Sequence, residues 1–91
     1  MKANKYQEAV AAMPLYDDPI LGLMGEVGEV VEHVKKDRRP GDRRKPLTKE
    51  KLIDEGGDVL WYLTRLFSEH DVTLSEVMEH NIEKLTARHS K

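Results

Sequence analysis

The stretch "LGLMGEVGEVVEHVKK", Leu21 to Lys36, decides the fold class of this 91-residue chain. Its apolar residues recur three and four positions apart, which is the spacing of one face of an α-helix. The stretch also carries Gly22, Gly25 and Gly28, although a glycine inside a helix costs about 1 kcal/mol relative to alanine. Three glycines in one helix therefore indicate that another group approaches the backbone, or that a group must fit beside the carboxylates of Glu26 and Glu29.

On either side of this stretch the helical spacing continues, and the prolines interrupt it. The pattern predicts an all-α fold, a small antiparallel helical bundle with a short N-terminal helix and three longer ones, as a single domain over residues 1–91. The expected helices cover residues 3–12, 19–38, 48–70 and 74–85. Asp18 is the expected N-cap of the second helix, Thr73 and Glu76 form a capping box for the fourth, and the tail "TARHSK" is expected to fray.

Composition excludes several classes of protein. The chain has no cysteine, which rules out disulfides and thiolate metal sites, and no apolar run near the roughly 20 residues of a membrane span. We therefore expect a cytoplasmic protein that does not bind membranes. The net charge of −2 argues against a nucleic-acid partner, although "KKDRRPGDRRKP" forms a basic loop. A domain this small buries little surface, so we expect its core to be completed in a homodimer or homotetramer.

Two pairs of carboxylates stand out on the predicted helices. Glu26 and Glu29 share one stripe of the second helix, and Glu55 and Asp58 lie beside the apolar face of the third. If these helices pack antiparallel, the pairs converge on one pocket. Four carboxylates suit Mg²⁺, with Mn²⁺ as a substitute, rather than zinc. A single ExxE pair also fits a solvated helix face, and the second pair is what favours a metal site.

The glycines need not share one explanation. Gly22 and Gly25 fall on the stripe of Glu26 and Glu29, where they would leave room for a metal-bound phosphate or a closely packed helix. Gly28 lies towards another face and is expected to admit a neighbouring backbone. Alanine at Gly25 should therefore reduce activity more than folding, whereas alanine at Gly28 should do the reverse or nothing.

Asn81 is an anomaly in the fourth helix, because it falls within the apolar stripe formed by Val77, Met78 and Leu85. A buried amide needs hydrogen-bond partners. It either fixes the register of a helix interface or, together with Lys84, faces a ligand pocket.

The chain resembles the MazG-like nucleoside triphosphate pyrophosphohydrolases in three segments, "GLMGEVGEVVEHVKK", "DEGGDVLWYL" and "NIEKLTAR". The mark of this family is ExxE followed by ExxD. The resemblance implies Mg²⁺-dependent hydrolysis between the α- and β-phosphates, which yields a monophosphate and pyrophosphate. It places Glu26, Glu29, Glu55 and Asp58 as catalytic residues and metal ligands. The chain departs from the family pattern at Gly56, where a leucine is usual, and it lacks the R-Y-P segment found after the fourth helix in many members.

Substrate contacts are expected from five further residues. Asn81 and Lys84 fall on the family's NxxK, and Lys36 with the arginines of the basic loop can reach the triphosphate. Trp61 and Tyr62 offer a face for the base, although Trp61 also fits packing against another subunit.

The alternative to an enzyme is a non-catalytic, homo-oligomeric helical module. In that reading the carboxylates only solubilise the bundle, and Asn81 fixes the register of its helices.

Overall fold

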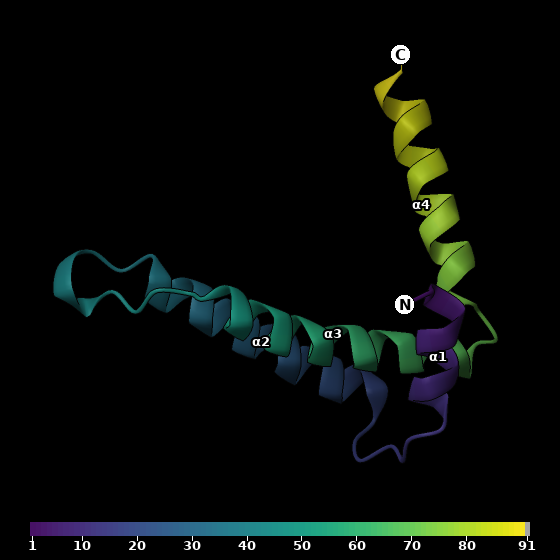
Figure 1. Ribbon diagram of the computed structural model, residues 1–91, viewed down its shortest axis with the longest axis horizontal. Coiled ribbons are helices and arrows are strands. Elements are labelled where there is room, and N and C mark those ends of the chain that lie inside the picture. The colour runs from purple at the N-terminus through teal and green to yellow at the C-terminus, as the bar shows by residue number, and fades with distance from the viewer. Residues whose placement is uncertain (91) are drawn as a thin grey trace. The chain divides into compact units, whose positions relative to one another are not determined.

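The computed structural model describes residues 1–90. Over these residues the chain is all-α, without a β-strand, and has four α-helices and one short 3₁₀ turn (Figure 1). The elements are α1 (Ala3–Ala11), α2 (Pro19–Asp37), η1 (Gly41–Arg43), α3 (Lys49–Glu69) and α4 (Leu74–His89). The predicted fold class is confirmed. None of the described helices combines the length and the apolar character that crossing a bilayer requires.

The predicted caps of α2 and α4 are confirmed. The Asp18 carboxylate accepts a hydrogen bond from the Ile20 amide at 3.0 Å, and Pro19 opens α2. At the start of α4, the Thr73 hydroxyl accepts from the Glu76 amide at 3.2 Å. The Glu76 carboxylate accepts from the Thr73 amide at 2.7 Å, which completes the capping box.

The predicted end of the last helix is wrong, because α4 continues to His89 instead of fraying at Thr86. The Ser90 amide still donates to the Thr86 carbonyl at 3.1 Å. Arg88 and His89 lie in the last turn, and basic side chains there are favoured by the negative end of the helix dipole.

The helices divide between two compact units. The first unit comprises residues 1–14 and the chain from Thr64 onward. Its buried side chains are those of Val10, Thr64 and Leu74. Gln7 joins its parts, because the side-chain amide donates to the Val72 carbonyl at 2.9 Å while its oxygen accepts from the Leu74 amide at 2.7 Å. One polar side chain of α1 thus fixes the turn that leads into α4.

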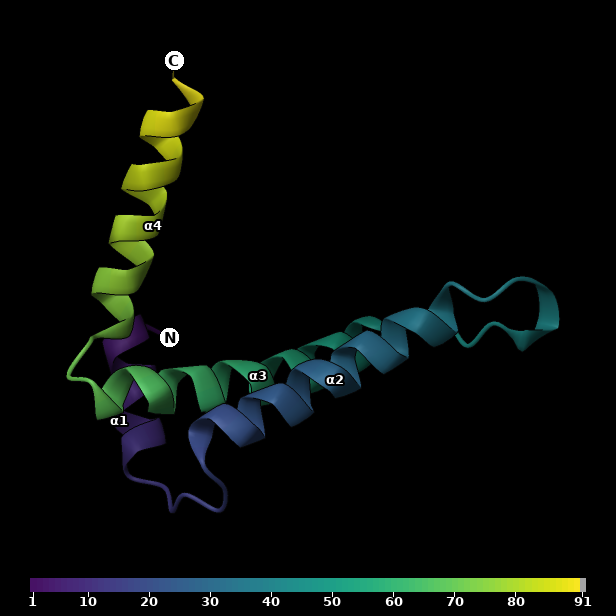
Figure 2. The same cartoon turned by 180° about the vertical axis from the view of Figure 1, so that it is seen from behind.

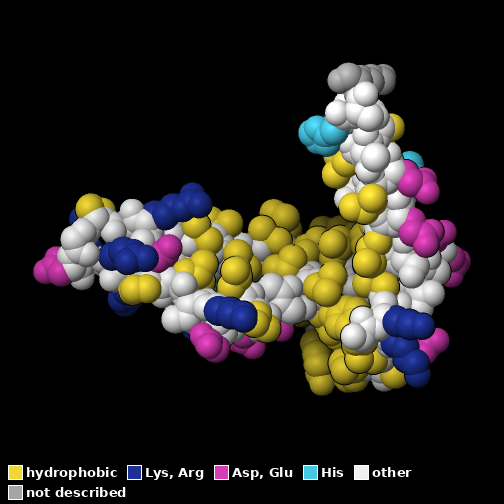
Figure 3. All heavy atoms as spheres, turned by 45° about the horizontal axis from the view of Figure 1, so that its top comes forward, with side chains coloured by type: hydrophobic (Ala, Val, Ile, Leu, Met, Phe, Trp, Pro, Cys, Tyr) yellow, Lys and Arg dark blue, Asp and Glu magenta, His cyan; other side chains and the backbone are white. Residues whose placement is uncertain are grey.

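The second unit, residues 15–63, is a helical hairpin. In it α2 and the first part of α3 run side by side in opposite directions, joined by the loop that contains η1 (Figures 1 and 2). Within residues 15–63 only Pro19 is buried. Leu21, Met24 and Val31 of α2 are 72%, 70% and 59% exposed, and apolar side chains lie open to solvent along the hairpin (Figure 3). The hairpin by itself therefore leaves a large part of its apolar surface exposed.

The glycines of α2 differ in their surroundings. A Cβ atom at Gly22 would overlap the ring of Tyr62. The close approach predicted there is real, but its partner is an aromatic ring of α3. Nothing lies within 4 Å of a Cβ atom at Gly25 or Gly28, so both positions are open in the single chain.

We predict that Gly22→Ala destabilises the fold by about 1–3 kcal/mol, because the new methyl group must displace the Tyr62 ring. A double-mutant cycle with Tyr62→Ala, measured by urea unfolding, isolates this contact. Gly25→Ala is the matched control, since it meets no atom and gains up to about 1 kcal/mol of helix propensity. An equal cost of Gly22→Ala with and without the Tyr62 ring would contradict the assignment.

Candidate functional site

Three carboxylates converge on the hairpin. Glu26 and Glu29 come from α2 and Glu55 from α3, and each offers an oxygen within 4.8 Å of the other two. Glu26 and Glu29 lie about one turn apart on one stripe of α2, and their closeness to Glu55 shows that this stripe faces α3. The structure therefore brings together three of the four predicted carboxylates, and these three residues could hold a metal ion.

Glu26 shows that the cluster lacks compensation for its negative charge. Its Oε2 atom is buried and has no hydrogen-bond partner among the described residues. Burial, and then the charge of Glu29, raises the pKa of Glu26 above its ordinary value of 4.5. A buried oxygen without a donor is costly. A cation with a preference for oxygen ligands fits this donor set, since it would satisfy the orphaned atom and offset the repulsion.

Asp58 lies outside the group of three but shares its electrostatic environment. Partial removal from water, followed by the charges of Asp54 and Glu55, raises the pKa of Asp58 above its ordinary 3.8. Asp58 in turn contributes to the raised pKa of Glu26. The fourth predicted carboxylate is thus close enough to interact with the cluster through its charge, and its role as a ligand remains a prediction.

Tyr62 borders the carboxylates on the side of Gly22. Removal from water is the main cause of the raised pKa of Tyr62, and the charges of Asp17, Glu26 and Asp58 add to it. Its ring meets that of Trp61 edge to face, with centroids 5.1 Å apart and planes at 82°. An aromatic pair therefore lies at this end of the carboxylate cluster.

His33 is a site residue to which sequence reasoning gave no role. Its Nε2 atom lies 3.3 Å from Glu55 Oε1, and the two side chains are only 27% and 13% exposed. The signal was present in the sequence, because His33 follows Glu29 by four residues and so continues the carboxylate stripe by one turn. This contact links His33 of α2 to one of the three clustered carboxylates, that of Glu55 in α3.

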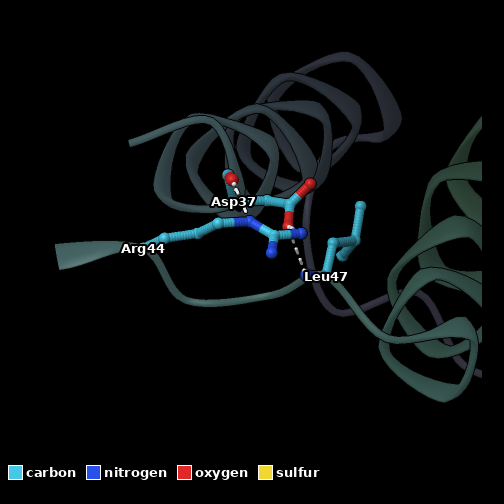
Figure 4. Close-up of polar contacts among 3 residues, drawn as sticks. All are labelled: Asp37, Arg44 and Leu47. Carbon is cyan, nitrogen blue, oxygen red and sulfur yellow. Dashed lines mark hydrogen bonds and ion pairs between the residues drawn. The ribbon is translucent and has the colours of Figure 1, made fainter. Parts of the chain in front are cut away.

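Beyond His33, the basic loop has an internal structure. The Asp37 carboxylate accepts hydrogen bonds from the Leu47 amide at 3.0 Å and from Arg44 Nη2 at 2.8 Å (Figure 4). The Leu47 amide, and then Arg44, lowers the pKa of Asp37 below its ordinary 3.8. Arg44 also donates through Nε to the Asp37 carbonyl at 2.8 Å. Of the arginines expected to contact substrate, Arg44 is therefore engaged in holding the loop.

Asn81 and Lys84 belong to the first unit. They line a cavity of about 330 Å³ together with Val77 and His80. Asn81 is exposed there rather than packed among apolar side chains. The structure places these two residues together, as the sequence predicted, and their approach to the carboxylates remains a prediction.

Comparison with known proteins gives two matches. The MazG nucleotide pyrophosphohydrolase domain matches residues 17–91. The Gene 37 protein of Mycobacterium phage L5 is 42% identical to the chain over 71 residues, which are 75% of this chain and 60% of that protein. The chain thus spans about 60% of the length of this curated relative. No solved structure gives a significant match.

We predict that Glu26→Gln raises the melting temperature of the metal-free protein at about pH 8. A carboxyl whose pKa is raised by folding contributes stability only below its unfolded pKa, and this contribution is lost as the pH rises through the folded value. The gain should therefore shrink as the pH falls from about 8 towards 4.5, the ordinary pKa of Glu26, because the folded protein then takes up a proton there. Thermal unfolding in EDTA over this range measures it.

Asp37→Asn is the control variant, and we expect it to change the melting temperature in the opposite direction. Because folding lowers the pKa of Asp37, its charge stabilises the fold above the ordinary 3.8, and this stabilisation is lost as the pH falls. The substitution should lower the melting temperature at about pH 8. A melting temperature for Glu26→Gln equal to that of the wild type at every pH would show that the cluster carries no uncompensated charge.

Proposed function

The chain belongs to the MazG nucleotide pyrophosphohydrolase domain family, and from that premise we propose that it is a Mg²⁺-dependent nucleoside triphosphate pyrophosphohydrolase. The observation that carries the proposal is the convergence of Glu26, Glu29 and Glu55 from two helices, with their oxygens within 4.8 Å of one another. Family membership supports hydrolysis of a nucleotide, and the cluster supports a metal requirement. We further propose that residues 1–91 act as a single domain in the cytoplasm.

The reaction is hydrolysis at the α-phosphorus. The oxygen of a water molecule forms a bond to that phosphorus, and the bond from it to the oxygen bridging to the β-phosphorus breaks. The electron pair leaves with pyrophosphate, and a carboxylate of the site accepts the proton of the water. Bound Mg²⁺, or Mn²⁺ in its place, would neutralise charge on the phosphate oxygens and acidify a water.

Each side chain of the site has a proposed role. Glu26, Glu29, Glu55 and Asp58 would hold the cation. His33 keeps Glu55 in position through its 3.3 Å contact. Tyr62 and Trp61 present an aromatic face to the nucleoside. Asn81 and Lys84 bind the substrate from α4, as the family's NxxK implies.

We also propose a homodimer or homotetramer. Leu21, Met24 and Val31 are exposed by 59% or more and recur on α2 at the spacing of one helix face, with Gly28 between them. Because Gly28 has open space, a second backbone can approach there. A second copy that covers this stripe would supply the core that the hairpin lacks by itself.

The activity is tested with a panel of ribo- and deoxyribonucleoside triphosphates and Mg²⁺, with pyrophosphate and orthophosphate measured separately. We expect pyrophosphate from at least one of them, and a loss of at least about a hundredfold in Glu29→Gln and Asp58→Asn, since each removes a charged ligand. Glu69→Gln, at an exposed carboxylate at the end of α3, should remain active.

Isothermal titration with Mn²⁺ gives a readout independent of turnover. Glu29→Gln should weaken Mn²⁺ binding, and Glu69→Gln should not. If the wild type releases no pyrophosphate from any triphosphate, or Asp58→Asn is as active as the wild type, the catalytic assignment is wrong. A wild type that neither binds Mn²⁺ nor hydrolyses a triphosphate would instead support the helical interaction module.

Self-association is tested with Met24→Glu, which places a charge in the middle of the exposed stripe. We expect the molar mass from light scattering to fall towards that of one chain, because burying an unpaired carboxylate in an apolar interface is costly. Lys5→Glu, at an exposed position of α1, is the control and should keep the mass of the wild type. A wild type with the mass of a single chain would contradict the proposal.

A further inference from the structure

A pocket rich in lysine lies at the loop end of the hairpin, beyond the carboxylates. It has a volume of about 280 Å³, and its lining includes His33, Lys36, Lys45, Thr48 and Lys51. No carboxylate lines this pocket within the described part of the chain. Lys and Arg side chains also gather over this end of the hairpin in the space-filling view (Figure 3). We call it the lysine pocket.

The wall of the lysine pocket is held in place by the loop. The Lys45 amide donates to the Lys36 carbonyl at 3.1 Å, so the backbone that carries one lysine is bonded to the backbone that carries another. Asp37 fixes the next segment of the wall through its hydrogen bond from the Leu47 amide (Figure 4). Thr48 then opens α3 by accepting from the Lys51 amide at 3.1 Å. Hydrogen bonds therefore hold the backbone segments that carry the lysines.

Two of the lysines are uncompensated. Over residues 1–90 no ion pair engages Lys45 or Lys51, and the Nζ atom of Lys36 is 4.0 Å from the nearest Glu32 oxygen. The first turn of α3 forms part of the wall and adds the partial positive charge of a helix N-terminus. Three ammonium groups around one pocket, without an acidic partner in its lining, form a site for a multiply charged anion.

The lysine pocket is joined to the carboxylate cluster through His33. This side chain lines the pocket and also contacts Glu55 at 3.3 Å. Glu29 precedes His33 by four residues on α2, and Lys51 precedes Glu55 by four on α3. Along both helices, pocket and cluster are thus about one turn, roughly 6 Å, apart. A chain of linked phosphates can occupy both at once.

We propose that the lysine pocket receives the β- and γ-phosphates of the triphosphate and holds them as pyrophosphate after cleavage. The inference rests on the proposed function, and it adds the direction in which the substrate lies. The α-phosphate sits at the carboxylates, and the nucleoside extends towards Tyr62 and Gly22 at the opposite end of the cluster. The group with the larger negative charge thereby meets the lysines, and the base meets the aromatic pair.

The test compares the two products as inhibitors. Lys45→Ala and Lys51→Ala should each raise the inhibition constant of pyrophosphate about tenfold and leave that of the nucleoside monophosphate unchanged. Lys45→Arg should recover most of the lost affinity, because it restores a cation at the same position. Lys35→Ala is the matched control on α2, since Lys35 pairs with Glu32 and does not line the pocket. Circular dichroism establishes that the variants are folded.

The outcomes separate this proposal from the proposed activity. In an active enzyme, Lys45→Ala and Lys51→Ala could leave inhibition by pyrophosphate unchanged, or weaken inhibition by both products equally. Either result overturns the assignment of the pocket, while the proposed activity stands. If the wild type hydrolyses no triphosphate, calorimetric titration with magnesium pyrophosphate decides. Binding that Lys45→Ala weakens and Lys35→Ala does not supports the pocket as a pyrophosphate site, and absence of binding to the wild type overturns it.

Discussion

Repulsion among three carboxylates is the constraint on which the rest of the hairpin depends. Glu26, Glu29 and Glu55 place oxygens within 4.8 Å of one another, and one of these side chains has a buried oxygen without a donor. Like charges at this separation destabilise a fold unless something compensates them. His33 Nε2 lies 3.3 Å from one oxygen of Glu55, and burial together with the charge of Glu29 raises the pKa of Glu26. A cation bound between these carboxylates would therefore stabilise the folded chain.

The hairpin is also polarised along its length. At one end the Tyr62 ring fills the space over Gly22, and at the other three lysines surround a pocket whose wall is bonded through Asp37. The carboxylates lie between these ends. The hairpin therefore presents an aromatic surface, then carboxylates, then lysines. This order matches the base, the α-phosphate and the β- and γ-phosphates of a nucleoside triphosphate. One pair of antiparallel helices can produce this order, because the three kinds of side chain lie on successive turns of the two facing stripes.

The hairpin buries few of its side chains. In the hairpin only Pro19 is buried, whereas large apolar side chains of α2 and α3 remain exposed. The first unit, by contrast, buries Val10 and Leu74 and uses the Gln7 amide to satisfy backbone groups of the turn before α4. The hairpin that carries the site thus leaves more large apolar side chains exposed than the unit that buries Val10 and Leu74.

The sequence by itself determined the helices and predicted that acidic side chains of two helices meet. Capping residues such as Asp18 and Thr73, and the recurrence of apolar side chains, act over a few neighbouring positions and can be read directly. The two acidic pairs likewise predicted a convergent site, since antiparallel packing leaves them few other arrangements. Only the tertiary structure decided that Tyr62 is the reason for Gly22, that His33 holds Glu55, and that Lys45 and Lys51 face one pocket. Each of these depends on the rotation of α2 against α3 or on the path of the loop between them. Side-chain packing and hydrogen bonds between residues distant in sequence set that geometry. The helical spacing that places His33 on the stripe of Glu29 does not by itself specify its partner on α3.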